Sequence, residues 1–286
     1  MTNTSLLRAA AATIALLGLC HSPVTFAQAA TPSAKKSTKA PTPSPWIPPD
    51  SADNVTELPK RYAGTSQKDV MAEIERTAPK LVRGEFETTN AFEERAQNLT
   101  AQFAAKYSSV AFTLEDAKFV YNADKSAFQQ KQYGGYHCQE EDAYLICSLD
   151  KLSHEFRNVL GGNAYGATTE VSKIRSVDFA IRLPKANVAA SGIFAKDPQV
   201  RRSYELGFEI PYEVDQARKN AGKPIRALFV GSVPEPKSFD LTTLFSAPTF
   251  ENPTQIWVTA KAVPFELKYV LFYFFDTGVV ISRVAR

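Results

Sequence analysis

Two cysteines and two histidines are the residues of this 286-residue chain whose types and spacing could most directly do chemistry. Cys138 and Cys147 stand nine positions apart, with His137 beside the first and His154 beyond the second. All four side chains could ligate zinc, but neighbours such as His137 and Cys138 point to opposite faces of a strand. In an oxidising compartment, two such cysteines favour a disulfide across a hairpin or loop. We therefore predict a structural Cys138–Cys147 disulfide and no metal site.

A second motif lies near the end of the chain. Asp276-Thr277-Gly278 resembles the active-site triplet of aspartic proteases, in which most of a lobe follows the triplet. Here only eight residues follow Gly278, and the chain holds no second copy of the triplet. We predict a tight hairpin turn instead, in which Gly278 takes a positive φ.

Two further motifs match only part of a catalytic or binding pattern. Ser148-Leu149-Asp150-Lys151 resembles the Ser-x-x-Lys of penicillin-recognising serine enzymes, but the companion Ser-x-Asn and Lys-Thr-Gly motifs are absent. The glycine-rich run 161–166 has Ala167 where a phosphate-binding loop needs lysine, which favours a turn or β-bulge. We therefore predict a surface helix start at the first motif. We assign no catalytic residue and no cofactor-binding residue, and we expect no cofactor.

Paired carboxylates precede a predicted helix. Glu85 and Glu87 would lie on the same side of an extended segment, where two carboxylates can do acid–base chemistry or bind a cation. They also lie just before Asn90, where the dipole of the following helix favours negative charge. We interpret them as solvated, capping-type charges.

The sequence predicts an α+β fold that begins with two N-terminal helices. Ser66 and Asp69 form a capping signal for a helix that Pro79 must end. A second helix is expected after Asn90. Asn90 would cap this helix, and Glu93 would complete the capping box. Its apolar residues recur at helical spacing and predict a core-facing stripe, namely Phe92, Ala96, Leu99, Phe103 and Tyr107.

After Tyr107 the pattern predicts strands joined by short turns, hence a mainly antiparallel sheet with short additional helices. One short helix is expected after Asp150, with Leu152, Phe156 and Leu160 facing inward, and another between Pro211 and Gly222. The unbroken apolar run 269–275 predicts a central strand buried on both faces. The expected strands are 117–121, 126–132, 144–149, 167–173, 177–183, 204–210, 225–230, 255–260, 265–275 and 279–284.

The first 29 residues are typical of a cleavable export signal. Arg8 precedes an apolar stretch from Ala9 to Leu19, which is too short to remain as a membrane span. Small residues end the signal, so we predict cleavage between Ala29 and Ala30. Lipidation at Cys20 is the alternative, but Leu19 stands where a lipoprotein signal needs a small residue. The predicted location is the periplasm, with full secretion as the alternative.

Composition divides the rest into a tether at 30–60 and an α+β domain at 61–286, with a possible subdomain boundary near 184–200. Prolines and lysines dominate the tether, which we expect to be dispensable for folding. From Trp46 onward, 29 basic and 30 acidic residues give a net charge of −1, which argues against nucleic acid as the partner. We predict a non-catalytic exported module that binds an envelope component or a protein partner. The alternative is a cell-envelope hydrolase with an unrecognised active site.

Overall fold

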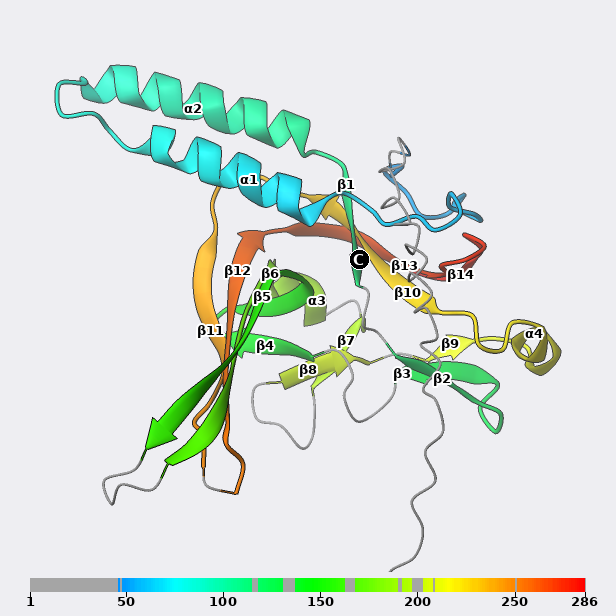
Figure 1. The fold of residues 1–286 in the computed structure, drawn as a ribbon. Helices are drawn as coiled ribbons and strands as arrows, with labels where there is room; N and C mark the ends of the chain where they lie inside the picture. The colour runs from blue at the N-terminus through cyan, green and yellow to red at the C-terminus, as the bar shows by residue number, and fades with distance from the viewer. Residues whose placement is uncertain are drawn as a thin grey trace, which may run out of the picture. The chain divides into compact units, whose positions relative to one another are not determined.

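The structure is a computed structural model of the chain (Figure 1). It describes Trp46 and residues 48–114, 118–130, 137–162, 168–189, 192–196, 203–207, 209–249 and 251–285. The predicted export signal, its cleavage site and the tether up to residue 45 lie outside the described residues. Within the described ranges, no helix is long and apolar enough to cross a membrane.

Helix α1 (Gln67–Thr77) begins where the sequence predicts. The Ser66 hydroxyl accepts a hydrogen bond of 3.2 Å from the Asp69 amide, so the predicted cap is confirmed. One face of α1 buries Val70, Met71 and Ile74 in the main core. The short 3-10 helix η1 (Ala78–Leu81) then carries Pro79 in its first turn and ends the helical run.

Helix α2 (Thr89–Lys106) corrects two predicted details. Its cap is Thr88, whose hydroxyl accepts from the Ala91 amide at 3.3 Å, and not Asn90. Only the C-terminal end of the predicted stripe is buried, at Phe103 and Tyr107. Helix α2 contacts η1, and the earlier residues of the stripe, Phe92, Ala96 and Leu99, are only partly buried.

Within the described residues, one sheet has four antiparallel strands in the order β1-β10-β13-β14. These are β1 (Val110–Leu114), β10 (Ile225–Ser232), β13 (Glu266–Phe274) and β14 (Val280–Ala285). Strand β13 lies between β10 and β14, and its residues from Tyr269 to Phe274 are all buried. The predicted central strand is therefore confirmed.

A second sheet has seven described strands in the order β11-β12-β6-β5-β4-β8-β7. Its pairs are antiparallel except β12 with β6, so the expected mainly antiparallel fold is confirmed in its coarse form. The strands are β4 (His137–Glu141), β5 (Tyr144–Gly162), β6 (Thr168–Pro184), β7 (Phe194–Lys196), β8 (Ser203–Leu206), β11 (Phe239–Ser246) and β12 (Thr254–Pro264).

The smaller elements complete the described part of the chain. A three-stranded sheet has the order β2-β3-β9 among the described residues. Its strands are β2 (Phe119–Asn122), β3 (Ala127–Gln130) and β9 (Ile210–Pro211), and the short helices are α3 (Lys185–Ala189) and α4 (Val214–Lys219). The sequence predicts Pro211 in the first turn of a helix, but this residue lies in strand β9.

Strand β5 overturns the helix predicted after Asp150. It runs without a break through that position and pairs with β6 along almost its whole length. The apolar spacing misled the prediction because residues four apart, such as Phe156 and Leu160, share a face in a strand as well as in a helix. The break expected in β6 between Lys173 and Val177 is also absent.

Residues 48–62 form a segment that we call the strap, and it packs on the four-stranded sheet. Ala52, Val55 and Leu58 are at most 6% exposed and join a buried cluster with residues of β10 and β13. The Leu58 amide donates to the Gly278 carbonyl at 2.8 Å. Residues 48–60, which the sequence assigns to the tether, therefore pack on the sheet despite their prolines.

The seven-stranded sheet contains strands from both sides of the subdomain boundary expected near 184–200. Strands β7, β8 and β12 come after this point, yet they join the same sheet as β4, β5 and β6. The main core lies between the two larger sheets, where Phe112 of β1 contacts Phe179 of β6 and Phe265 with ring centroids 4.9 and 5.5 Å apart. All the described residues thus belong to one compact unit.

Candidate functional site

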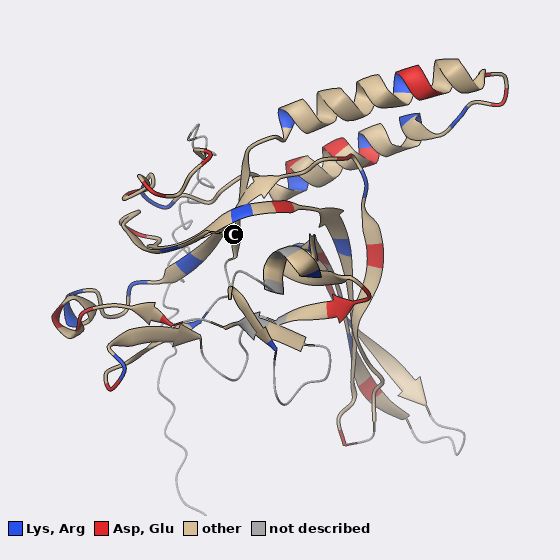
Figure 2. Cartoon of the chain, turned by 180° about the vertical axis from the view of Figure 1, so that it is seen from behind, with Lys and Arg blue, Asp and Glu red and all other residues tan. Residues whose placement is uncertain are grey.

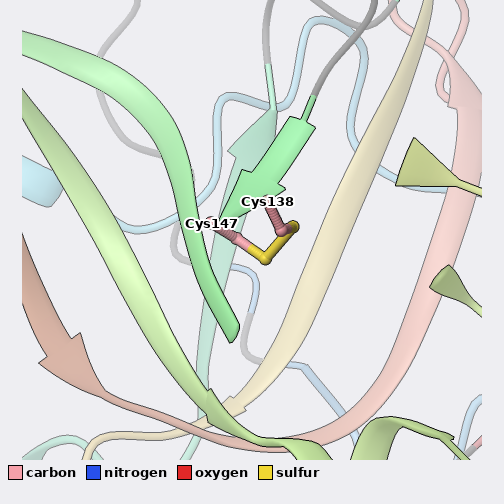
Figure 3. Close-up of a disulfide and its surroundings, with 2 residues drawn as sticks. All are labelled: Cys138 and Cys147. Atoms are coloured by element: carbon pink, nitrogen blue, oxygen red, sulfur yellow. A yellow bond between two sulfur atoms is a disulfide. The ribbon is translucent and has the colours of Figure 1, made fainter. Parts of the chain in front are cut away.

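The structure contains the disulfide that the sequence predicts (Figure 3). Cys138 of β4 lies directly opposite Cys147 of β5, with Cα atoms 4.3 Å apart, and both residues are fully buried. Since both thiols are consumed, neither can ligate a metal. His154 is exposed on β5, and the described side chains form no group of three or more potential metal ligands. The disulfide links β4 and β5, which are neighbouring inner strands of the seven-stranded sheet.

The triplet Asp276-Thr277-Gly278 forms the turn between β13 and β14, as predicted. Gly278 has a φ of 84°, and a Cβ there would lie 2.0 Å from the carbonyl oxygen of Leu58. Asp276 faces Arg61 across 3.6 Å at the surface. The glycine is therefore needed for the turn and for the close approach of the strap, and the aspartate makes an exposed ion pair.

The Ser-x-x-Lys motif lies within a strand. Ser148 and Lys151 are both in β5, so the helix that this motif requires is missing. On the neighbouring strand, Asp178 is half-buried, and burial raises the pKa of its carboxyl group. It accepts a hydrogen bond of 3.2 Å from the Ser176 hydroxyl. These contacts show a carboxylate held by strand hydroxyls and no assembled nucleophile.

Glu87 is engaged by an arginine and Glu85 is exposed. Two nitrogens of Arg95, in α2, donate hydrogen bonds of 2.9 and 2.7 Å to the Glu87 carboxylate. The Gly84 amide donates to the same carboxylate at 3.1 Å. The Arg95 hydrogen bond is the main cause that lowers the pKa of Glu87 to about 2. This carboxylate anchors the turn before α2 and is too weak a base for proton transfer near neutral pH. Of the glycine-rich run, residues 163–166 lie outside the described residues.

A cavity that the sequence did not predict is the strongest candidate site. It has a volume of about 730 Å³ and lies between the β2–β3 hairpin, α4 and the start of β10. Its size falls within the range of small-molecule sites, which are mostly apolar with a few polar groups. The apolar part of its lining comprises Phe119, Val120, Tyr121, Ala123, Phe128, Val214, Ala217, Ala221, Pro224 and Ile225.

Local hydrogen bonds hold the walls of the cavity in place. The Asn122 side chain accepts from the amides of Asp124 and Lys125 and so closes the β2–β3 turn. The Tyr121 hydroxyl then donates to the carbonyl of Tyr212 at 2.9 Å, which joins the hairpin to the segment that leads into α4. Burial raises the pKa of the Tyr212 phenol, so this ring stays neutral. These hydrogen bonds connect the hairpin and the segment before α4 that together form the cavity.

Among the described residues, the charged groups that line the cavity are Lys118, Arg218 and Lys223, all of them cationic. No Asp or Glu belongs to the described lining. Arg218 contacts Asp215 at 3.3 Å, but both side chains are largely exposed to water, where such ion pairs are weak. Lys223 donates to the Asn220 side chain at 2.8 Å. The lining therefore favours an apolar ligand that carries a negative group.

Helices α1 and α2 carry charged side chains of both signs. Figure 2 shows Lys and Arg interspersed with Asp and Glu along α1 and α2. The cationic lining of the cavity thus differs from the helices, where charges of both signs pair, as in the contact of Lys106 with Glu73 at 2.9 Å.

Comparison with known proteins gives no relative for this chain. A scan against known protein families, a search of curated proteins and a search of solved structures each found no match.

Proposed function

We propose that this chain is an exported, non-catalytic binding protein whose cavity takes an amphiphile, an acyl-like chain with an anionic head group. The observation that carries the proposal is the cavity of about 730 Å³, which has apolar walls and, among its described lining residues, only cationic charged groups. Burial of apolar surface supplies the affinity, and the cations select the anionic head. An amphiphile of this kind is an envelope component, which is the class of partner predicted from the sequence.

The disulfide supports a location outside the cytoplasm. Disulfides persist in oxidising compartments, and Cys138 and Cys147 are joined in the core. Together with the predicted export signal, this supports a location outside the cytoplasm, and we propose the periplasm, with full secretion as the alternative. The test is fractionation of a bacterial host that expresses the full chain, with intact-mass measurement of the product. We expect protein in the periplasmic fraction that begins at Ala30 without lipid, and a lipid adduct at Cys20 would contradict this.

Calorimetric titration with dodecyl phosphate and with dodecanol tests the ligand class. We expect dodecyl phosphate to bind more tightly, because only it carries the negative charge that Lys118 and Arg218 attract. Val120→Asp places a negative charge in the wall of the cavity, at a side chain that is 53% exposed and so tolerates the change. We expect this variant to bind dodecyl phosphate at least about tenfold more weakly.

Val82→Asp is the matched control, because Val82 is 70% exposed and lies outside the cavity lining. It should bind dodecyl phosphate as the unmodified protein does. Lys118→Gln should reduce the preference for the phosphate over the alcohol, and added salt should do the same. Equal binding by the Val120→Asp and Val82→Asp variants, or no binding of either ligand, would refute the proposal.

Among the described residues, the half-buried Asp178 is the feature that supports the alternative, an envelope hydrolase. Its Ser176 partner would have to serve as part of a nucleophilic site. Replacement of Asp178 by Asn separates the two functions. A binding protein keeps its affinity for dodecyl phosphate in this variant, whereas a hydrolase that depends on Asp178 loses turnover of peptidoglycan or ester substrates.

A further inference from the structure

A second, independent site is suggested by the outer part of the seven-stranded sheet. Here β5, β6, β12 and β11 continue past the buried core, and the β5–β6 pair runs on side by side to its tip (Figure 1). Residues Glu155, Arg175, Trp257 and Phe245 are register partners on four neighbouring strands. They therefore form one row across a single face of the sheet.

The next row on the same face is also polar. Arg157 of β5 pairs with Lys173 of β6, which pairs with Gln255 of β12. Apart from Phe245, the residues of both rows line a groove of about 350 Å³, which we call the outer groove. Its charged lining residues are three cations and one anion, Glu155, a net of +2 (3 minus 1). This local charge is opposite to the net −1 of the chain from Trp46 onward.

An aromatic platform lies at one side of the outer groove. Trp257 is 38% exposed, and the edge of its ring meets Phe245 with centroids 5.8 Å apart. The Arg175 guanidinium lies 5.3 Å from the centre of the Trp257 ring. The cation–π contact and the ring contact fix the indole in place, while more than a third of its surface stays open to a ligand.

We propose that the outer groove binds an acidic polysaccharide. The apolar C–H face of a sugar ring fits against the exposed indole of Trp257, and the carboxylates of neighbouring sugars pair with Arg157, Lys173 and Arg175. An extended chain of rings also suits a groove that crosses several strands. The inference does not depend on the cavity, because the two sites share no lining residue.

The arrangement favours this ligand over other anionic chains. Nucleic-acid binders normally carry a basic excess on the folded domain, and the net charge of −1 from Trp46 onward argues against this class of ligand. A polyanion without rings would use the cations but leave Trp257 without a role. A ligand that needs both the ring and the charges therefore distinguishes the proposal from simple charge attraction.

The test uses tryptophan fluorescence, because the chain has only two tryptophans, Trp46 and Trp257. Trp46 packs edge-on against Tyr62, so Trp46→Phe keeps an aromatic ring there and leaves Trp257 as the single reporter. We expect polygalacturonate to change the emission of Trp257 in a saturable way, and neutral dextran to have no effect.

Arg157→Gln and Trp257→Leu should each weaken the binding of polygalacturonate at least about fivefold, measured by calorimetry so that the readout survives the loss of Trp257. The control is Lys68→Gln, which removes one exposed positive charge on α1 and should leave affinity unchanged. Circular dichroism and melting curves confirm that each variant is folded.

Three results would overturn the proposal. Polyphosphate could bind as tightly as polygalacturonate, with no effect of Trp257→Leu, which would show charge attraction alone. Lys68→Gln could weaken binding as much as Arg157→Gln, which would place the contact elsewhere. Sedimentation could show a dimer that covers Trp257 and dissociates in the Trp257→Leu variant, which would make the groove an interface between two copies of the chain.

Discussion

The substitution Leu58→Ala tests how much the proline-rich strap stabilises the fold. Leu58→Ala deletes three carbon atoms from a side chain that is 3% exposed. At about 0.8 kcal/mol for each buried CH₂, the transfer contribution alone is about 2.4 kcal/mol. The cavity that remains raises the expected loss of unfolding free energy to about 2.7–5 kcal/mol. For a domain of this size, the melting temperature should fall by about 5–20 °C.

Shortened chains extend the same test. A protein that begins at Arg61 loses three buried strap residues, Ala52, Val55 and Leu58, and uncovers Tyr269 and its neighbours on β13. It should unfold far below the full chain or fail to fold, whereas a protein that begins at Trp46 should melt with the full chain. Calorimetry or circular dichroism gives the melting temperature, and Glu57→Ala, at an exposed strap position, is the control. If the protein that begins at Arg61 melted with the full chain, our assignment of the strap to the domain would be wrong.

Three further outcomes follow from the structure. Replacing both disulfide cysteines by alanine should cost about 2–3 kcal/mol of unfolding free energy, because the closed loop is short, and an unchanged urea midpoint would contradict this. Gly278→Ala should lower the melting temperature more than Gly192→Ala, since both glycines have positive φ but only the first would press a Cβ against Leu58. Burial raises the pKa of the Tyr269 phenol to about 12, so the stability it contributes is complete below pH 10 and is lost as pH rises to about 12. Melting curves across that range, beside the phenolate absorbance, measure this loss, and a flat profile would count against it.

Local features of the fold were predictable because their causes are local. The Ser66 cap, the turn at Gly278 and the buried strand at 269–275 each depend on a few neighbouring residues. The disulfide was predictable because Cys138 and Cys147 are the only cysteines after Cys20 and lie close in sequence.

The rest depends on contacts between distant parts of the chain. Proline content predicted a free tether, but the hydroxyls of Tyr269 and Tyr273 bind the carbonyls of Pro49 and Tyr62, more than 200 residues earlier. Such long-range contacts leave no periodic signal in a single sequence. The strand that replaces the helix predicted after Asp150 has the same origin, because pairing with β6 determines it.

The candidate sites were missed for a related reason. The cavity joins residues 118–128 to residues 214–225, so its apolar wall and its cations are not neighbours in the sequence. The outer groove likewise needs the register of three strands before Arg157, Lys173 and Trp257 come together. Each site does contain an apolar residue that remains exposed outside the core, and such residues indicate a binding surface. Val120 and Trp257 are both more than a third exposed although both belong to strands.

The two proposals can be tested separately, because the two sites share no lining residue. The cavity wall belongs to the three-stranded sheet, α4 and β10, and the outer groove belongs to β5, β6 and β12. Substitutions at sites that share no partner have additive effects. Val120→Asp should therefore weaken only the binding of dodecyl phosphate, and Trp257→Leu only that of polygalacturonate. If each variant weakened both ligands equally, one common site or partial unfolding would explain the data better than two sites, and the assignment of separate ligands would have to be abandoned.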